Sequence, residues 1–259
     1  MSRKLALVTG ASGGIGEAFA RELAKRGYDL GLAARSVEKL ETLATELRGQ
    51  GVEAHVFPAD LSAADGPSKL MQAVHEAGLR VDLLVNNAGF GDLEPFDRAD
   101  APKLTEMIDL NVGALTGLSR AVTPGLIERG RGGIINIAST AAFLPGPGMA
   151  TYYATKAFVL SLSEALHVEM EPKGITVTAV CPGPTWSGFQ EKADMEGSKL
   201  LKASRMMTPD AVARIGMDGY EKKKRVVVTG VSNKITIAIA KLTPKSILMK
   251  AISGLQEKP

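Results

Sequence analysis

Short apolar runs alternate along the chain with longer stretches that have the hydrophobic spacing of amphipathic helices. The helical stretches cover residues 17–26, 36–48, 67–77, 102–129, 152–171 and 209–220. The apolar runs have the length of strands and cover residues 5–10, 28–35, 52–60, 81–89, 133–139, 175–183 and 226–230. Most of these runs lack polar alternation, which indicates burial on both faces. Because right-handed crossovers turn such a series into a doubly wound sheet, the pattern predicts an α/β fold with seven parallel strands.

The end of the chain differs from the rest in charge. Residues 221–259 contain nine lysines and arginines against two acidic residues, whereas residues 1–220 contain 22 against 26. Apolar and lysine positions recur with helical spacing on both sides of Pro244, which predicts two short amphipathic helices. No other shift in composition divides the chain. We therefore predict a single Rossmann-type domain over residues 1–230 and a basic, amphipathic helical appendage over residues 231–259.

The composition narrows the class of protein. With 259 residues, of which 45% are hydrophobic and 23% charged, the chain is expected to form one large globular core. A single cysteine, Cys181, rules out a disulfide framework, and the three histidines have no metal-ligand spacing, so we expect no metal site. The start of the chain lacks a signal-peptide pattern, and no apolar run is long enough to span a bilayer. We expect a cytoplasmic protein.

The first apolar run is followed by a glycine-rich turn that leads into a helix at about Glu17. Residues 9–16 read Thr-Gly-Ala-Ser-Gly-Gly-Ile-Gly. Glycines at a strand-to-helix turn permit positive φ and let backbone N–H groups approach a pyrophosphate, whose charge the helix N-terminus also favours. This position in the first strand–helix unit favours dinucleotide binding over a turn without a ligand. The predicted phosphate contacts are Gly10, Ser12, Gly14, Ile15 and Gly16.

The end of the second apolar run determines which dinucleotide we expect. NAD-binding sites often place an acidic residue there to accept from the ribose 2′-hydroxyl, but this chain has Arg35 followed by Ser36. A guanidinium pairs with a 2′-phosphate, so we predict NADP(H) in preference to NAD(H); the alternative is an arginine that only covers the surface. After the third run, Asp60 and Leu61 are candidates for the adenine end, although an aspartate there would equally cap the next helix.

Further motifs follow in order along the chain. They are Asn86-Asn87-Ala88-Gly89, Asn111, Ser139, Tyr152-x-x-x-Lys156 and Pro182-Gly183. Together with the glycine-rich turn, these residues resemble the short-chain dehydrogenase/reductase family over about residues 4–230. The tail is similar to that of long-chain oxoacyl and hydroxysteroid reductases in the family. The resemblance implies an oxidoreductase that acts on a small carbonyl or alcohol compound and assembles as a homodimer or homotetramer.

The resemblance assigns roles to four of these residues. Tyr152 is the general acid in reduction and the base in oxidation, Ser139 hydrogen-bonds the substrate oxygen, and Lys156 holds the nicotinamide ribose. Asn111 supports a water that relays protons to the lysine. Chemistry supports the first role, because a free phenol has a pKa of about 10 and needs help to ionise at neutral pH. Lys156 stands one helical turn after Tyr152, so its ammonium is expected to lower the pKa of the phenol, as is the cation of an oxidised nicotinamide.

The same tyrosine–lysine spacing recurs later in the chain, at Tyr220 and Lys224. Thirteen positions before Tyr152 stands Ser139, but thirteen before Tyr220 stands a methionine. The second pair also falls where a predicted helix gives way to the last strand. We therefore expect only the first pair to be catalytic.

The remaining cofactor contacts are placed by the resemblance and by the rule that open α/β sheets bind ligands at the carboxyl ends of their strands. The motif after the fourth run is expected against the adenosine ribose. The motif after the sixth is expected to turn the chain beneath the nicotinamide, with a threonine near its carboxamide. In addition to Tyr152 and Lys156, these contacts are Asn87, Ala88, Gly89, Pro182, Gly183 and Thr185.

The segment from 186 to 208 is the candidate substrate lid, and it ends at Thr208-Pro209, a good start signal for a helix. An adaptable apolar segment suits a hydrophobic carbonyl compound, while packing of the lid on the body without any ligand contact is an equal alternative. The apolar members are Trp186, Phe189, Met195, Leu200, Leu201, Met206 and Met207.

We therefore predict an enzyme that transfers a hydride between NADP(H) and a carbonyl or alcohol group of a hydrophobic substrate. Two other classes stay open: a non-catalytic dinucleotide sensor, which the intact catalytic set argues against, and a peripheral membrane adaptor. The tail could cover the mouth of the active site, pair subunits or rest weakly on an anionic membrane surface. No nucleic-acid partner is expected, because the basic run at 222–225 is interpreted as a solvated segment.

Overall fold

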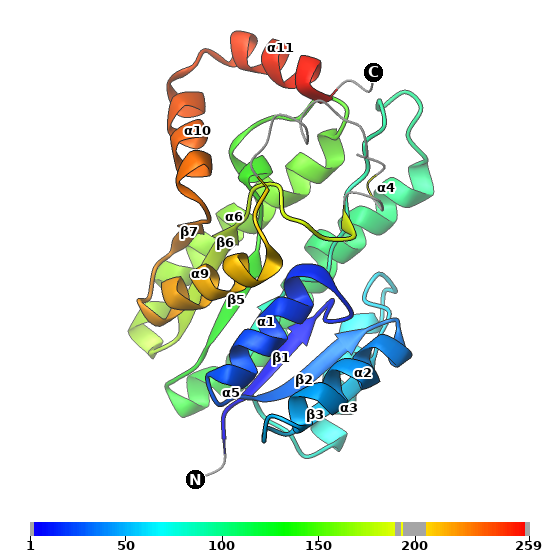
Figure 1. Ribbon diagram of the computed structural model, residues 1–259, viewed down its shortest axis with the longest axis vertical. Coiled ribbons are helices and arrows are strands. Elements are labelled where there is room, and N and C mark those ends of the chain that lie inside the picture. The colour runs from blue at the N-terminus through cyan, green and yellow to red at the C-terminus, as the bar shows by residue number, and fades with distance from the viewer. Residues whose placement is uncertain (1–2, 190–192, 194–205, 257–259) are drawn as a thin grey trace.

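The computed structural model describes residues 3–189, 193 and 206–256 (Figure 1). Its seven strands form one parallel sheet in the order β3-β2-β1-β4-β5-β6-β7, which confirms the predicted doubly wound α/β fold. Every predicted apolar run contains one strand. The strands are β1 (Leu5–Thr9), β2 (Asp29–Ala34), β3 (Ala54–Pro58), β4 (Val81–Asn86), β5 (Gly133–Ile137), β6 (Thr176–Cys181) and β7 (Val226–Val228).

Helices cover both faces of this sheet (Figure 1). One face packs against α1 (Gly14–Lys25), α2 (Val37–Arg48) and α9 (Pro209–Glu221). The other packs against α3 (Gly66–Glu76), α5 (Leu115–Arg129) and α6 (Ala150–Met170). The remaining helical segments are α4 (Ala101–Ile108), the π turn η1 (Asp109–Ala114), the 3₁₀ turns η2 (Thr140–Phe143) and η3 (Glu171–Lys173), α10 (Val231–Leu242) and α11 (Lys245–Gln256).

The central strands have no solvent face, which explains why their sequences lack polar alternation. In β1, Ala6 and Val8 join the core under α1 and α9, whereas Leu5 and Leu7 join the core under α3 and α5. All four side chains are buried. Side chains of alternate residues point to opposite faces of a strand, so a strand covered on both sides must be apolar throughout.

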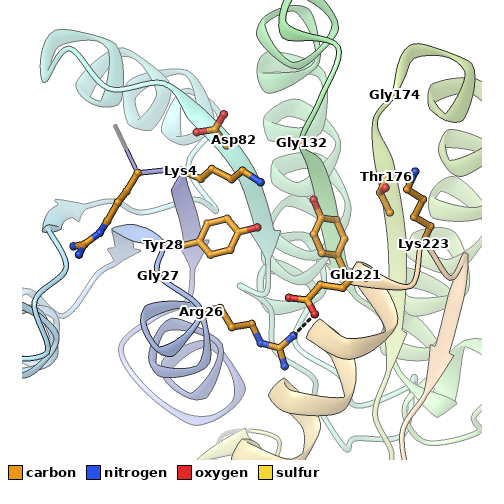
Figure 2. Close-up of a pocket in the computed structure, with 12 residues that line it drawn as sticks. Lys4, Arg26, Gly27, Tyr28, Asp82, Gly132, Gly174, Thr176, Glu221 and Lys223 are labelled. Carbon is orange, nitrogen blue, oxygen red and sulfur yellow. Dashed lines mark ion pairs between the residues drawn. The ribbon is translucent and has the colours of Figure 1, made fainter. Parts of the chain in front are cut away.

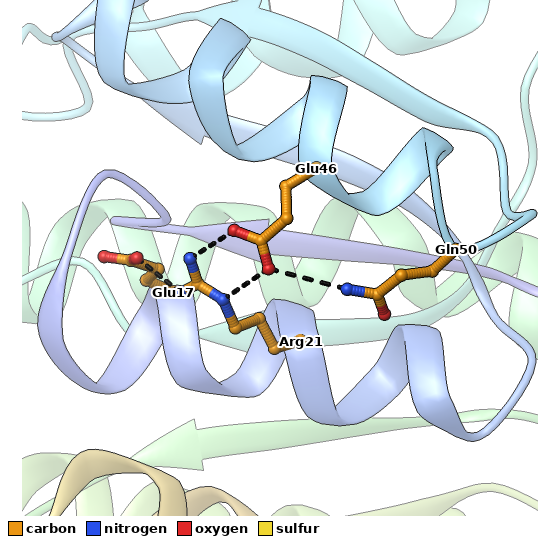
Figure 3. A network of polar contacts seen from close by, with 4 residues as sticks. All are labelled: Glu17, Arg21, Glu46 and Gln50. Carbon is orange, nitrogen blue, oxygen red and sulfur yellow. Dashed lines mark hydrogen bonds and ion pairs between the residues drawn. The ribbon is translucent and has the colours of Figure 1, made fainter.

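A polar network ties the first two helices together on the surface (Figure 3). Arg21 on α1 donates to Glu17 on its own helix and to both carboxylate oxygens of Glu46 on α2, with N–O distances of 2.9 and 2.6 Å. Gln50 adds a longer contact of 3.5 Å to Glu46. The network holds α1 in place behind the glycine-rich turn.

Two helices differ from the sequence prediction. The first begins at Gly14 and not at Glu17, because the last glycines of the turn themselves form the first helical turn. The helix predicted over 102–129 is interrupted by the π turn η1. Within that turn, both polar atoms of the Asn111 amide bond the backbone of Phe90, which holds this part of the helix out of α register.

Several strands end before the apolar runs do. In the run at 81–89, β4 ends at Asn86, because the amides of Asn87 and Ala88 donate to the Thr9 hydroxyl and not to the backbone of a neighbouring strand. In the run at 175–183, β6 ends at Cys181, because the next residue, Pro182, has no N–H to donate to a neighbouring strand. The residues beyond the strand ends are those predicted to meet the cofactor.

A cavity of about 620 Å³ lies at the amino ends of the strands, opposite the edge where ligands of such sheets bind (Figure 2). Tyr28 and Asp82 face it from one side, and the Arg26–Glu221 ion pair, 2.8 Å long, closes another. None of the predicted site residues lines this cavity.

Candidate active site

The four predicted catalytic residues lie together at the carboxyl edge of the sheet. Ser139 lies two residues after the end of β5, and α6 carries Tyr152 and Lys156 one turn apart. Asn111 comes from the π turn. A Cβ built on Gly89 would lie 2.7 Å from Asn111 Oδ1 and 3.6 Å from Lys156 Nζ, so these two polar atoms converge on the same glycine.

Ser139 is held by the 3₁₀ turn that it starts. Its Oγ accepts from the Ala141 amide at 3.1 Å, which is the hydrogen bond of a helix N-cap. The same side chain lies near the phenol of Tyr152, whose pKa it lowers. The 3₁₀ turn therefore holds the serine beside the tyrosine.

Lys156 is buried beside the tyrosine ring. Its Nζ donates to the carbonyl oxygen of Ile137 at 2.9 Å and lies 5.8 Å from the centroid of the Tyr152 ring. Burial lowers the pKa of Lys156 to about 8, because the charged form loses its solvation. The lysine is thus a cation that can lose its proton near neutral pH.

The pKa of Tyr152 differs from the sequence prediction. Burial raises it above its ordinary value, and the nearby Ser139 side chain offsets only part of that rise. The ammonium of Lys156 was expected to lower the pKa, but it is directed at the Ile137 carbonyl and not at the phenol oxygen. In the protein alone, the tyrosine therefore keeps its proton at neutral pH.

Asn111 is fixed by three hydrogen bonds. Its Oδ1 accepts from the Phe90 amide at 3.1 Å, and its Nδ2 donates to the Phe90 carbonyl at 2.9 Å and to Thr155 Oγ1 at 3.1 Å. The Thr155 hydroxyl in turn donates to the Tyr152 carbonyl at 2.7 Å. The asparagine thereby links the π turn to the helix that carries the tyrosine.

The glycine-rich turn has the backbone that a phosphate loop requires. Gly10 and Gly14 have φ values of +64° and +58°, a region that favours glycine. A Cβ on Gly16 would overlap the Gly10 carbonyl oxygen, so only glycine lets α1 approach β1 this closely. The first amides of α1 have no partner within the helix and are suited to bind a pyrophosphate. These observations fit a dinucleotide.

Two of the predicted cofactor contacts, Ile15 and Leu61, could meet a cofactor only through backbone atoms, because their side chains pack into the protein core. Ile15 packs its side chain against the core under α1, and Leu61 is buried in the core on the other face. Asn87 braces the turn from the next strand, since its Nδ2 donates to the carbonyls of Thr9 at 2.9 Å and Gly10 at 3.2 Å. The Asn87 side chain therefore stabilises the glycine-rich turn through its backbone carbonyls.

At the predicted ribose end, the side chains remain accessible. Arg35 is 67% exposed and lies 3.6 Å from Glu106 of α4 in an ion pair. Ser36 stands at the N-cap position of α2, but its side chain makes no capping hydrogen bond. Asp60 accepts from the amide and hydroxyl of Ser62, at 3.1 and 2.7 Å, so it caps the local turn and not α3.

The loop after β6 contacts two other segments near the candidate site. The Pro182 carbonyl accepts from the Thr140 amide at 2.9 Å, which ties this loop to the turn that holds Ser139. Thr185 is buried and donates to the Gly183 carbonyl at 2.9 Å. Asn233 of α10 lies so close to Gly183 that a Cβ there would overlap it.

An apolar wall borders the tyrosine. The rings of Phe189 and Tyr152 have centroids 5.3 Å apart. A Cβ on Gly91 would meet Phe189 at 2.8 Å, Tyr152 at 3.0 Å and Met149 at 3.2 Å, so this glycine makes room for the ring contact. Trp186 of the predicted lid is exposed, while Met207 packs on the main core. Met195, Leu200 and Leu201 lie outside the described residues.

Sequence reasoning missed five residues that shape this region. No local motif marks them, because each acts through contacts with residues distant in the chain. A glycine two positions after the Asn-Asn-Ala-Gly motif was a weak signal for one of them. The missed residues are Gly91, Met149, Thr155, Ser187, which lies against Gly14, and Asn233. Among the described residues, no cluster of His, Cys, Asp or Glu could hold a metal ion.

Known proteins share both the sequence and the fold. The family model of short chain dehydrogenases matches residues 4–196. A very-long-chain 3-oxoacyl-CoA reductase of Anas platyrhynchos is 42% identical over 182 residues, which is 68% of this chain but only 58% of that relative. The chain thus spans less than two thirds of that reductase.

Two solved structures superpose over nearly the whole chain. The short-chain dehydrogenase from Sphingobium yanoikuyae in complex with NADPH has a TM-score of 0.82 and 34% identity, covering 92% of this chain and 94% of its own. A bulky-bulky ketone specific alcohol dehydrogenase from Comamonas testosteroni has a TM-score of 0.78 and 31% identity, covering 93% of both. The chain therefore belongs to the short-chain dehydrogenase family, whose members are oxidoreductases that bind NAD(P)(H).

Proposed function

We propose that this oxidoreductase uses NADP(H) to interconvert a ketone and an alcohol on a hydrophobic substrate, with Tyr152 as general acid and base. The observation that carries the proposal is the convergence of the Ser139 hydroxyl and a buried, protonated phenol beside Lys156. This grouping supplies a proton donor and a cation at one point, which a dinucleotide sensor does not need. When bound, the dinucleotide supplies the hydride in reduction or accepts it in oxidation.

In reduction, the substrate oxygen gains negative charge and then a proton. Ser139 donates a hydrogen bond to that oxygen, and Tyr152 transfers its phenol proton to it. The rise in the pKa of Tyr152 keeps the proton in place until an oxyanion develops. In oxidation, the steps reverse: the alcohol oxygen gives its proton to the Tyr152 phenolate, and Ser139, which lowers the pKa of the phenol, stabilises that phenolate.

The proton lost by Tyr152 must be replaced from solvent. Asn111 Oδ1 has a second lone pair after accepting from Phe90, and it faces the same glycine as Lys156 Nζ. A water held between these two atoms would relay protons from solvent to the lysine. Lys156, with a pKa of about 8, can both give and take a proton there at neutral pH.

The cofactor preference rests on the residue after β2. Arg35 offers a guanidinium at the position where NAD-binding sites place a carboxylate, and Ser36 has a side chain that capping does not use. A solved relative with 34% identity holds NADPH. These features favour a 2′-phosphate over a 2′-hydroxyl.

The substrate class rests on the apolar wall beside Tyr152. Phe189, Met149 and Leu93 belong to one cluster around the tyrosine, and only apolar groups of a substrate can lie against it without leaving a polar atom unpaired. One relative is named for very-long-chain oxoacyl substrates and another for bulky ketones. A hydrophobic ketone is consistent with both names.

The test is a series of ketones of increasing chain length, with NADPH consumption followed in each. We expect kcat/KM to rise about fourfold per added methylene, since each buried CH₂ is worth about 0.8 kcal/mol. Phe189→Ala should flatten this dependence, whereas Phe158→Ala, an exposed phenylalanine on α6, should preserve it. No consumption with any ketone, or no dependence on chain length in the wild-type protein, contradicts the proposal.

A further inference from the structure

The last two helices, residues 231–256, form an arm that leaves large apolar side chains in solvent. The arm runs up one side of the molecule and across its top (Figure 1). Of the thirteen large apolar side chains that are exposed in the described part of the chain, six lie in this arm. They are Val231, Ile235, Ile239, Leu242, Ile247 and Met249, and Leu242 is the most exposed of all thirteen at 88%.

Four of these side chains form one stripe on α10. At about 100° per residue, Val231, Ile235, Ile239 and Leu242 fall within an arc of about 80°. The buried side chains of α10, Ile237 and Ala240, lie on the opposite side of the helix. The apolar stripe, residues 231, 235, 239 and 242, therefore points away from the body of the protein.

The arm is attached beside the candidate site. Asn233 donates to the Thr229 carbonyl at 2.7 Å and packs against Gly183. Lys241 Nζ lies 5.4 Å from the centroid of the Phe143 ring in η2, the turn that begins after Ser139. The stripe is thus held at a defined position on the molecule.

The charges of the arm decide which partner suits the stripe. Residues 231–256 contain Lys234, Lys241, Lys245 and Lys250 and no acidic residue. A second copy docking through the same face would bring these lysines against one another, and lysine is depleted in protein interfaces. An anionic lipid surface accepts both features, because apolar side chains enter the acyl boundary while lysines meet the headgroups.

We propose that the arm binds the surface of an anionic lipid bilayer, with the apolar stripe immersed and the lysines at the phosphates. None of the described helices combines the length and hydropathy needed to cross a membrane, so this contact is one of surface adsorption. The inference does not depend on the proposed reaction, since its measurements are of binding and mass and not of turnover.

The test is co-sedimentation of the full chain with vesicles of phosphatidylcholine alone and of phosphatidylcholine with phosphatidylglycerol. We expect binding to the mixed vesicles only. Ile235→Ser/Leu242→Ser should weaken that binding about a hundredfold, because each buried aliphatic side chain contributes about tenfold or more. Ile127→Ser/Val168→Ser removes two exposed apolar side chains from α5 and α6 and should leave binding unchanged. Lys234→Gln/Lys250→Gln should reduce the preference for anionic lipid.

The molar mass of each variant in solution separates lipid from a second copy. The proposal expects the same mass for wild type and Ile235→Ser/Leu242→Ser. A smaller mass for that variant, together with no vesicle binding by the wild type, would show that another subunit covers the stripe and would overturn the proposal. Wild-type binding that the stripe variant retains in full would overturn it as well. Circular dichroism verifies that each variant is folded.

Discussion

Two tyrosines of this chain have a lysine four positions later and are equally buried, yet they lie at opposite edges of the sheet. Tyr152 and Tyr220 are each 9% exposed, and burial raises the pKa of both phenols. Neither the spacing nor the burial separates them. What separates them is the set of groups around each ring.

The lysine partners show the difference. Lys156 lies on the same helix as Tyr152, buried and bonded to the Ile137 carbonyl. The helix of Tyr220 ends at Glu221, and the chain then turns, so Lys224 is exposed and its side chain does not stand one helical turn along. The tyrosine–lysine spacing therefore carries chemical meaning only where a helix continues through it.

The surroundings of the two rings also differ in accessible space. Tyr220 borders the cavity of about 620 Å³ at the amino ends of the strands, with Tyr28 and Asp82 nearby (Figure 2). Tyr152 is one of the residues that line a smaller cavity of about 10 Å³. The larger of these two cavities therefore lies away from the proposed catalytic groups.

Removing the phenol oxygen of each tyrosine should separate the two residues by their effect on turnover. Tyr152→Phe should lower kcat for ketone reduction by about 10²–10⁴, the usual contribution of a general acid. Tyr220→Phe, equal in burial and in chemistry, should leave kcat within about twofold, since it touches no proposed catalytic group. Steady-state rates with NADPH measure both. Equal losses in the two variants would remove Tyr152 from its role.

The pH dependence tests the lysine partner. The pKa of Lys156 is lowered to about 8 by burial, so its cation is present below that pH and is lost as the pH rises through it. We expect kcat/KM for NADPH, which reports groups of the free enzyme, to fall about tenfold per pH unit above about 8. Lys224→Met should keep this limb, because Lys224 has no part in it. A profile that stays flat to pH 10 in the wild type would exclude the lysine as the titrating group.

The role of Arg35 in cofactor preference can be tested by making the same charge change at the carboxyl ends and at the amino ends of the strands. Arg35→Asp should weaken NADPH binding by about 10- to 100-fold, as loss of a charge-assisted hydrogen bond does, and should leave NADH nearly unchanged. Lys4→Asp makes the same charge change beside the amino-edge cavity and should affect neither. Fluorescence titration of both nucleotides provides the affinities. If both variants weaken NADPH alike, the effect is one of net charge and Arg35 recognises nothing.

The smallest expected effect concerns the partner of Arg35. Glu106 holds the guanidinium at 3.6 Å, and both side chains are largely solvated. Exposed pairs of this kind are worth about 0.2–1 kcal/mol, so Glu106→Gln should tighten NADPH by about fivefold at most and leave NADH unaltered. Weaker NADPH binding in this variant would show that Glu106 helps to orient Arg35 and does not compete for it.

Most of the fold could be predicted because local patterns and burial agree. Seven apolar runs without polar alternation define seven strands that are covered on both faces, and the helix signals at Thr208 and Pro209 mark the start of α9. The π turn at 109–114 could not be predicted, because it depends on hydrogen bonds between Asn111 and Phe90, which are distant in sequence. The end of a strand likewise depends on which neighbour its amides meet.

The candidate site was predictable where a motif occupies consecutive or helically spaced positions. Ser139, Tyr152 and Lys156 fall in this class, and the structure brings them together. Residues such as Gly91 and Asn233 could not be found, because their importance lies in the contacts they make with other segments. The rise that burial causes in the pKa of Tyr152 in the protein alone was also missed at the sequence level, where the ammonium of Lys156 was expected to act on the phenol and not on the Ile137 carbonyl.

The position of a substrate-like ketone in a crystal structure of the protein with NADP⁺ would show whether Tyr152 is the proton donor. We expect the ketone oxygen to lie within about 2.6–3.2 Å of the phenol oxygen of Tyr152 and within hydrogen-bond distance of Ser139. A ketone oxygen that touches neither group, or a ligand seated at the amino edge beside Tyr220, would contradict this expectation.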